Sequence, residues 1–146
     1  MNRGGYKQHN QYNQVQIKTA NKGKLIVMLY QGAIRFMNRA LLLLEKKDME
    51  GKGNALIRAQ DIILELLYSL DQDLLNQDDE LSLNLRRLYL YSYRRLVHAN
   101  VHMDTEAIEE VVTLMQNLLQ AWEQVIHNDG SGGANPAPPS RVALTG

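Results

Sequence analysis

His98 and His102 come nearest to a metal-binding or catalytic pattern in this chain of 146 residues. Two imidazoles four residues apart on one helix can bind the same metal ion. Ala99, however, follows His98 where an HExxH metalloprotease motif needs a glutamate. No glutamate is followed by a histidine three residues later, as a di-iron bundle would require. We therefore expect two solvent-exposed histidines on a polar helix face, no metal or cofactor, and no enzymatic activity.

A cluster of tyrosines and arginines raises the possibility of nucleic-acid binding. Tyr89, Tyr91 and Tyr93 could stack on bases while Arg94 and Arg95 contact phosphates. On a helix, however, Tyr91 points to a different side from the other two tyrosines. The chain has 16 Lys and Arg against 16 Asp and Glu, so no excess positive charge holds a polyanion. We expect the tyrosines to lie between helices with their hydroxyls at the surface, and no nucleic-acid partner.

The composition favours a cytoplasmic protein. The chain has no cysteine, which excludes disulfides, thiol catalysis and sulfur metal sites and suits a reducing compartment. The first 24 residues are polar, so no signal peptide is visible. Gln31, Arg35 and Arg39 interrupt the apolar run that follows, so we expect no membrane insertion.

Helical periodicity dominates the middle of the chain. Apolar residues recur at spacings of three and four in four segments: 17–44, 54–74, 80–102 and 105–127. Gly51 and Gly53 should separate the first two segments, and Trp122 should lie in the core with a partner for its indole N–H. No segment has the period of a strand. The predicted fold is all-α, an antiparallel four-helix bundle with short connections.

The two ends of the chain differ from the middle in composition. Residues 1–20 are rich in Asn, Gln and Gly and predict a flexible N-terminal arm. Residues 21–128 form the predicted bundle, a one-domain length. Residues 129–146 are rich in Gly, Ser and Pro and predict a disordered C-terminal tail.

Every predicted helix carries a second apolar arc beside its inward stripe. A four-helix bundle needs only one inward stripe per helix. Doubled stripes indicate exposed grooves for helices of another chain, or else tighter burial of one central helix or self-association. Six members of these arcs are candidates for contacting a partner: Ile34, Ile57, Leu64, Val97, Val101 and Leu119.

The same segments carry a family resemblance. The blocks concerned are Tyr12, Ile17, Thr19-Ala20, Leu25 to Phe36, Ala59 to Ile63, Tyr93 to Leu96, Ala99-Asn100 and Ala121-Trp122. They resemble the signature of the FliS family of flagellar secretion chaperones over about residues 9–127. One departure is that Asn21, Lys22 and Lys24 stand where the family usually has Ser or Thr, then Pro, then Glu. This weakens the family's capping box, so we expect a loose helix start and a soft hinge there.

The resemblance implies a function. FliS-like proteins bind the disordered C-terminal segment of new flagellin in the cytoplasm, and that segment becomes helical on the chaperone. This prevents premature polymerisation and keeps flagellin competent for flagellar type III secretion. The implied partners are the flagellin C-terminal segment and the flagellar export apparatus, with the protein a monomer or weak dimer. The alternative is a self-associating structural or regulatory helical bundle.

Tyr12, Val15 and Ile17 are the apolar anchors of the otherwise polar N-terminal arm. Because the arm is tethered to the first helix, it can fold back on a groove at high effective concentration. FliS-like proteins are thought to use this segment as a cap. We therefore expect these three residues to shield part of the flagellin groove in the free chaperone.

Overall fold

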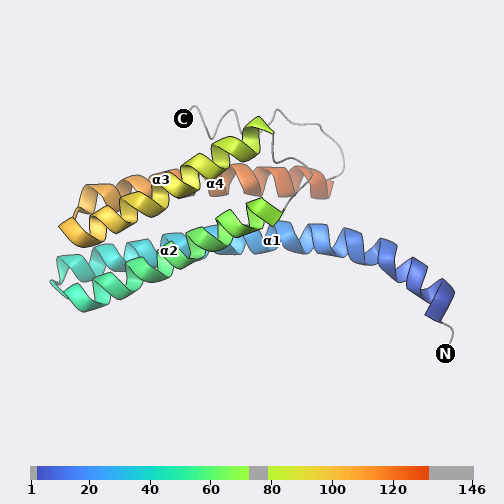
Figure 1. Cartoon of the computed structure of the whole chain (residues 1–146), viewed down its shortest axis with the longest axis horizontal. Helices are drawn as coiled ribbons and strands as arrows, with labels where there is room; N and C mark the ends of the chain where they lie inside the picture. The colour runs from blue at the N-terminus through green and yellow to red at the C-terminus, as the bar shows by residue number, and fades with distance from the viewer. Residues whose placement is uncertain (1–2, 73–78, 132–146) are drawn as a thin grey trace.

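The computed structural model describes the backbone of residues 3–72 and 79–131, and the side chains of residues 22–71 and 79–128. Four helices follow in order: α1 (Arg3–Glu45), α2 (Met49–Gln72), α3 (Glu80–His102) and α4 (Thr105–Ser131). Successive helices run in opposite directions, and α1 also packs on α4, so the four helices close a bundle (Figure 1). The predicted antiparallel four-helix bundle is confirmed.

Helix α1 begins earlier than the sequence indicated. We expected its start near Asn21, whereas its backbone is helical from Arg3. No proline lies in this segment, so no residue obliges the helix to stop there. Its N-terminal part extends beyond the other three helices (Figure 1). The division at residue 20 between arm and bundle stays a prediction.

The turn between α1 and α2 is built from two residues. Lys47 adopts the left-handed conformation (φ 62°), and the Asp48 N–H donates to the Leu43 carbonyl at 2.8 Å, closing α1 with a Schellman motif. Asp48 Oδ1 then accepts the Gly51 N–H at 2.9 Å and caps α2. Because of this cap, α2 begins at Met49 and includes Gly51, where we had expected a break and a start near Asn54.

The turn between α3 and α4 uses the same arrangement. Met103 is left-handed (φ 54°), and the Asp104 N–H donates to the Ala99 carbonyl at 3.1 Å. Asp104 Oδ1 accepts the Ala107 N–H at 3.2 Å at the start of α4. These short turns hold each helix pair antiparallel.

A hydrogen-bonded aromatic group joins three helices inside the core. The Trp122 indole N–H on α4 donates to the Tyr30 hydroxyl on α1 at 3.1 Å, which supplies the partner that we expected it to need. The hydroxyls of Tyr30 and Tyr89 share a further hydrogen bond, with ring centroids 6.3 Å apart. Tyr89 is 3% exposed, so the expectation that its hydroxyl reaches the surface was wrong. Its hydroxyl is satisfied by another buried hydroxyl, and burial therefore costs little.

Candidate protein-binding face

The outward side of α2 carries three large apolar side chains in one stripe. Ile57, Leu64 and Tyr68 are spaced by seven and four residues, which places them on one helix face. Their side chains are 48%, 43% and 63% exposed. The inward residues of α2 already belong to the core, so core packing does not account for this stripe.

The outward side of α3 carries a matching stripe. Leu83, Leu90, Val97 and Val101 are spaced by seven, seven and four residues. Leu90 is half-buried, whereas Leu83, Val97 and Val101 are 39%, 41% and 68% exposed. This second stripe likewise lies outside the core of α3, which is formed by other residues.

Two polar contacts hold α2 beside α3, one toward each end of their seam. Arg86 of α3 donates to the Asp71 carboxylate of α2 in a partly exposed ion pair. Lys52 of α2 is buried, and its ammonium donates to the backbone carbonyl and the side-chain oxygen of Asn100 at 3.0 and 2.8 Å. A buried ammonium without acceptors would be costly, so this contact favours one register of α2 on α3.

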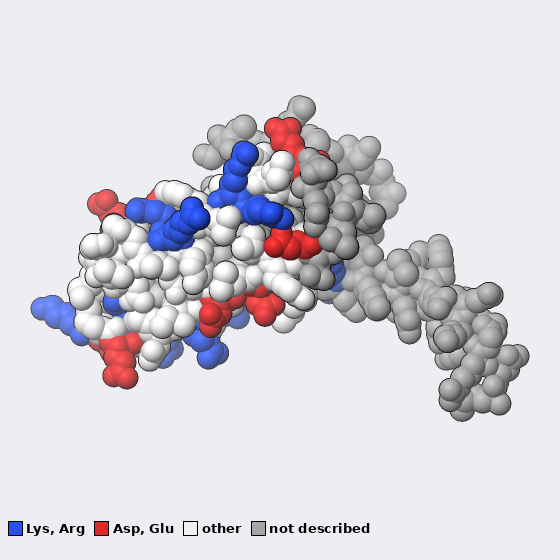
Figure 2. Space-filling view, in the orientation of Figure 1, with Lys and Arg blue, Asp and Glu red and all other residues white. Residues whose placement is uncertain are grey.

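The two apolar stripes border this seam. Leu64 lies seven residues before Asp71, and Leu90 lies four residues after Arg86, so each shares a helix side with a residue that reaches the other helix. We call the α2–α3 face the set Ile57, Leu64, Tyr68, Leu83, Leu90, Val97 and Val101. Uncharged atoms cover much of the surface over α2 and α3, with basic side chains along α3 (Figure 2).

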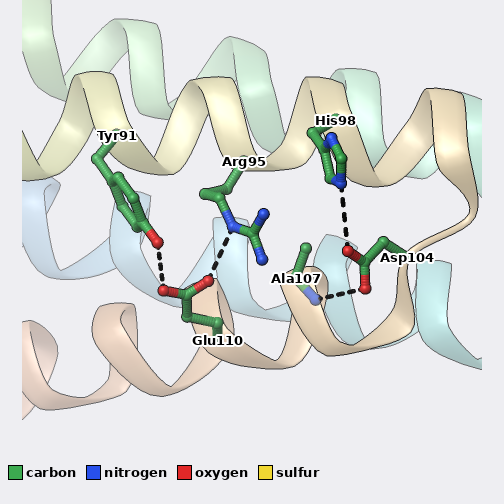
Figure 3. Close-up of polar contacts among 6 residues, drawn as sticks. All are labelled: Tyr91, Arg95, His98, Asp104, Ala107 and Glu110. Atoms are coloured by element: carbon green, nitrogen blue, oxygen red, sulfur yellow. Dashed lines mark hydrogen bonds and ion pairs between the residues drawn. The ribbon is translucent and has the colours of Figure 1, made fainter.

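The seam between α3 and α4 is different, because polar contacts close it (Figure 3). Glu110 accepts the Tyr91 hydroxyl at one oxygen and Arg95 Nε at the other, the latter at 2.9 Å. Farther along, His98 Nε2 lies 3.3 Å from Asp104 Oδ2. This seam offers charged groups to solvent where the α2–α3 face offers apolar ones.

Two ionisable groups of the α3–α4 seam, Tyr91 and Asp104, have pKa values moved by their neighbours. The hydrogen bond to Glu110 raises the pKa of the Tyr91 hydroxyl, because ionisation would set two anions side by side. The backbone N–H of Ala107 lowers the pKa of the Asp104 carboxyl, and the positive charge of Arg95 lowers it further. Both changes move the pKa away from neutral pH, so the Tyr91 hydroxyl stays protonated and the Asp104 carboxyl stays ionised across the physiological range.

The two histidines lie on this polar side. His98 and His102 are exposed, with ring centroids 4.5 Å apart and an interplanar angle of 40°. Within the side chains that the structure describes, no three His, Cys, Asp or Glu residues are grouped so that they could hold a metal ion. The pair therefore gives no support to a metal centre.

Comparison with known proteins decides what kind of protein carries this face. The family model "Flagellar protein FliS" matches residues 5–129. A flagellar secretion chaperone FliS of Bacillus subtilis is 40% identical over 127 residues, covering 84% of this chain and 92% of the relative. Those of Salmonella typhimurium and Escherichia coli are 42% and 38% identical, covering 75% and 74% of this chain and 79% and 78% of the relatives. The chain belongs to the FliS family.

Membership of the FliS family makes this protein a flagellar secretion chaperone and not an enzyme. The family resemblance found in the sequence is thereby confirmed. Of the helices in the described part of the chain, none combines the length and apolar character needed to cross a membrane.

Four of the six residues predicted to contact a partner lie together on this FliS-family bundle. Ile57, Leu64, Val97 and Val101 are all members of the α2–α3 face. Ile34 and Leu119 lie elsewhere: both are half-buried and packed against the core. Ile34 lies one helical turn after Tyr30 on α1, and Leu119 lies one turn before Trp122 on α4. Because Tyr30 and Trp122 contact each other, both residues lie at the α1–α4 seam. Their role in binding stays a prediction.

Three members of the α2–α3 face were absent from the predicted set. Tyr68 is four residues after Leu64, and Leu83 and Leu90 precede Val97 by fourteen and seven residues. The sequence signal for them was present, since they continue the same arcs at helical spacing. On α1, Leu25 and Met28 are also 50% and 63% exposed, so a second apolar region exists outside this face.

The predicted N-terminal cap is made of Tyr12, Val15 and Ile17. Their backbone belongs to α1, but their side chains lie outside the part of the chain whose side chains the structure describes. Most of the predicted tail, from residue 132 onward, also lies outside the described residues, whereas the backbone of α4 is helical to Ser131. The N-terminal cap and the disordered C-terminal tail therefore both stay predictions.

Proposed function

We propose that this FliS-family protein binds the disordered C-terminal segment of flagellin in the cytoplasm. Bound on the chaperone, that segment becomes helical and is withheld from premature polymerisation. It stays competent for type III secretion by the flagellar export apparatus. The relatives' name, flagellar secretion chaperone, supports a client that is a secreted flagellar protein.

The observation that carries this proposal is the α2–α3 face. Its most exposed members range from 39% to 68% exposure, although the bundle beneath them has a complete apolar core. Two parallel rows of apolar side chains with a seam between them suit the apolar stripe of an amphipathic helix. Burial there must exceed the ordering cost of a disordered segment, about 2 to 5 kcal/mol.

A double substitution on the two helices tests the assignment. Leu64→Asp with Val97→Asp should weaken binding of a flagellin C-terminal peptide by several kcal/mol, on the order of 100-fold or more, because two charges would be buried against apolar surface. Thermal unfolding should change only modestly, since both side chains are already exposed. Isothermal titration calorimetry and circular dichroism measure the two effects.

The matched control places the same two charges on α4. Thr113 and Gln120 are exposed polar residues of α4, so Thr113→Asp with Gln120→Asp should leave affinity and stability nearly unchanged. If the α2–α3 variant binds as tightly as this control, the face is not the flagellin site. The pair Ile34→Asp and Leu119→Asp tests the remaining predicted residues, which count as core if that variant simply unfolds.

Self-association is the competing function for an exposed apolar face. We expect a monomer or weak dimer, so light scattering after size exclusion should give close to the monomer mass of 16.6 kDa. A stable dimer that dissociates in the Leu64→Asp, Val97→Asp variant would instead support the self-associating bundle.

A further inference from the structure

The charged residues beside the α2–α3 face differ in sign between the two helices, apart from Glu80, which lies one turn before Leu83 at the end of the face. Asp61 and Glu65 are exposed on α2, whereas Arg87 and Arg94 are exposed on α3. Asp61 lies between Ile57 and Leu64 along its helix, and Arg94 lies between Leu90 and Val97. No ion pair involves any of these four charged side chains within the described part of the chain.

The nearest basic residue on α2 does not cancel the acidic edge. The Arg58 guanidinium lies 5.2 Å from the centroid of the Phe36 ring, which belongs to α1. Its charge is therefore directed toward α1, on the side of α2 remote from α3. The α2–α3 face consequently has an acidic border, Asp61 and Glu65, on α2 and a basic border, Arg87 and Arg94, on α3, with the apolar side chains between them.

We propose that this face selects an amphipathic helix with one acidic and one basic flank, and that these charges set the direction in which the helix lies. The inference rests on the proposed function, because it takes the client to bind as a helix on this face. The acidic flank lies against Arg87 and Arg94. The basic flank lies against Asp61 and Glu65.

The handedness of an α-helix converts this charge pattern into a direction. In Figure 1, α2 runs from left to right below α3. Consider a right-handed helix that lies in front of α2 and α3 in this view, runs in the direction of α2 and turns its apolar stripe toward them. In such a helix the residue after each apolar anchor points toward α3. The residue before each anchor points toward α2. A helix with acidic residues after its anchors and basic residues before them therefore lies parallel to α2, and the exchanged pattern lies antiparallel.

Reversal of the bound helix changes every border contact from attractive to repulsive. Each exposed ion pair contributes little by itself, but four such contacts change sign together. The preference for the favoured direction should be on the order of tenfold at low salt and should shrink as salt screens the charges.

Two designed peptides of identical composition provide the direct test. Both repeat a seven-residue unit with Leu at the first and fourth positions. One has Glu at the fifth and Lys at the seventh position, and the other has the two exchanged. Each carries a nitroxide at its N-terminus, and broadening of methyl NMR signals locates that end on the chaperone. The first peptide should broaden Ile57 and Val101, and the second should broaden Leu83 at the opposite end of the face.

A charge-exchanged chaperone supplies the reciprocal test. Asp61→Lys and Glu65→Lys combined with Arg87→Glu and Arg94→Glu alter four exposed residues without ion pairs, so the bundle should stay folded. In this variant each peptide should broaden the methyl groups at the opposite end from before. The same exchange should weaken a flagellin C-terminal peptide whose flanks are charged in the favoured sense.

The outcomes separate this inference from the proposed function. If either peptide broadens both ends equally, or the charge exchange leaves the positions unchanged, the direction rule is wrong while the face remains a helix-binding site. If neither the designed peptides nor the flagellin peptide perturbs these methyl groups, the proposed function at this face is wrong as well.

Discussion

At the scale of single residues, the buried hydroxyl of Ser92 stands out. Ser92 is fully buried on α3, and its Oγ has no hydrogen-bond partner among the described residues. A buried polar group without a partner carries a desolvation cost of about 1 to 3 kcal/mol. Its small size suits a position that faces the centre of the bundle, whereas its polarity does not.

We predict that Ser92→Ala raises the free energy of unfolding by about 1 kcal/mol, because it removes the unpaired hydroxyl without adding volume. Urea denaturation measures the change. Ser69→Ala at a half-buried position of α2 is the control, since it carries the same gain in helix propensity. A gain no larger than that of the control would mean that the Ser92 hydroxyl is satisfied in solution.

The buried tyrosines predict a loss of stability in alkali. Burial raises the pKa of Tyr89 to about 12 and also raises the pKa of Tyr30 well above its ordinary value. Between about pH 10 and 12 the unfolded chain has lost the Tyr89 proton that the folded protein keeps. The contribution of Tyr89 to the free energy of unfolding is therefore fully present below pH 10, and ~3 kcal/mol of it is lost as the pH rises to 12. Urea denaturation at a series of pH values across this range should show that the free energy of unfolding falls less steeply in Tyr89→Phe than in the unaltered protein. An unchanged slope would contradict the role of Tyr89.

At the scale of elements, the two helix hairpins depend on the same turn chemistry. Lys47 and Met103 adopt the left-handed backbone conformation, and each is followed by an aspartate that caps the next helix. The cap on α2 sits against a glycine: a Cβ on Gly51 would lie 2.6 Å from Asp48 Oδ2. Gly51 therefore permits the close approach of the capping carboxylate, which explains why a glycine here lies within a helix.

We predict that Asp48→Ala lowers the free energy of unfolding by about 1 kcal/mol, because the Gly51 N–H loses its acceptor. Asp48→Asn should restore most of the loss, since an amide oxygen also caps a helix. Thermal denaturation of the two variants is the measurement. Equal destabilisation by Ala and Asn would show that the negative charge, and not the hydrogen bond, is what matters at this turn.

At the scale of the whole molecule, we expect the N-terminal segment to affect how accessible the apolar surface of the bundle is. The first part of α1 extends beyond the other helices (Figure 1). The predicted anchors Tyr12, Val15 and Ile17 belong to the N-terminal half of α1. A tethered segment can cover apolar surface in the free chaperone and yield it to a client. Such a cap would limit aggregation before flagellin arrives.

We predict that Tyr12→Ala with Ile17→Ala speeds association of a flagellin C-terminal peptide and makes the free protein aggregate more readily. Stopped-flow fluorescence measures the association rate, and light scattering measures aggregation. Gln8→Ala with Gln14→Ala, which changes polar residues of the same segment, should alter neither. An association rate that stays the same or falls in the Tyr12, Ile17 variant would rule out a shielding role for the segment.

Local periodicity in the amino-acid sequence determines much of this fold. The spacing of apolar residues predicted four helices, because a helix brings together residues that are three and four positions apart within the same segment. The bounds of α3 and the start of α4 were predicted correctly. The start of α2 was not, because Gly51 and Gly53 favour a break until the Asp48 cap and the left-handed Lys47 are seen together.

Only the tertiary structure decided which apolar arcs are exposed. Ile34 and Leu119 have the same sequence signal as Ile57 and Leu64, yet they are half-buried where α1 packs on α4. Farther along the same seam, a Cβ on Gly23 would be 3.3 Å from the Ile126 side chain, so α1 and α4 also pack closely there. Burial depends on neighbours distant in sequence, as the contact between Tyr30 and Trp122 across 92 residues shows. For this reason the sequence could identify the arcs, whereas the packing of the four helices selected the α2–α3 face.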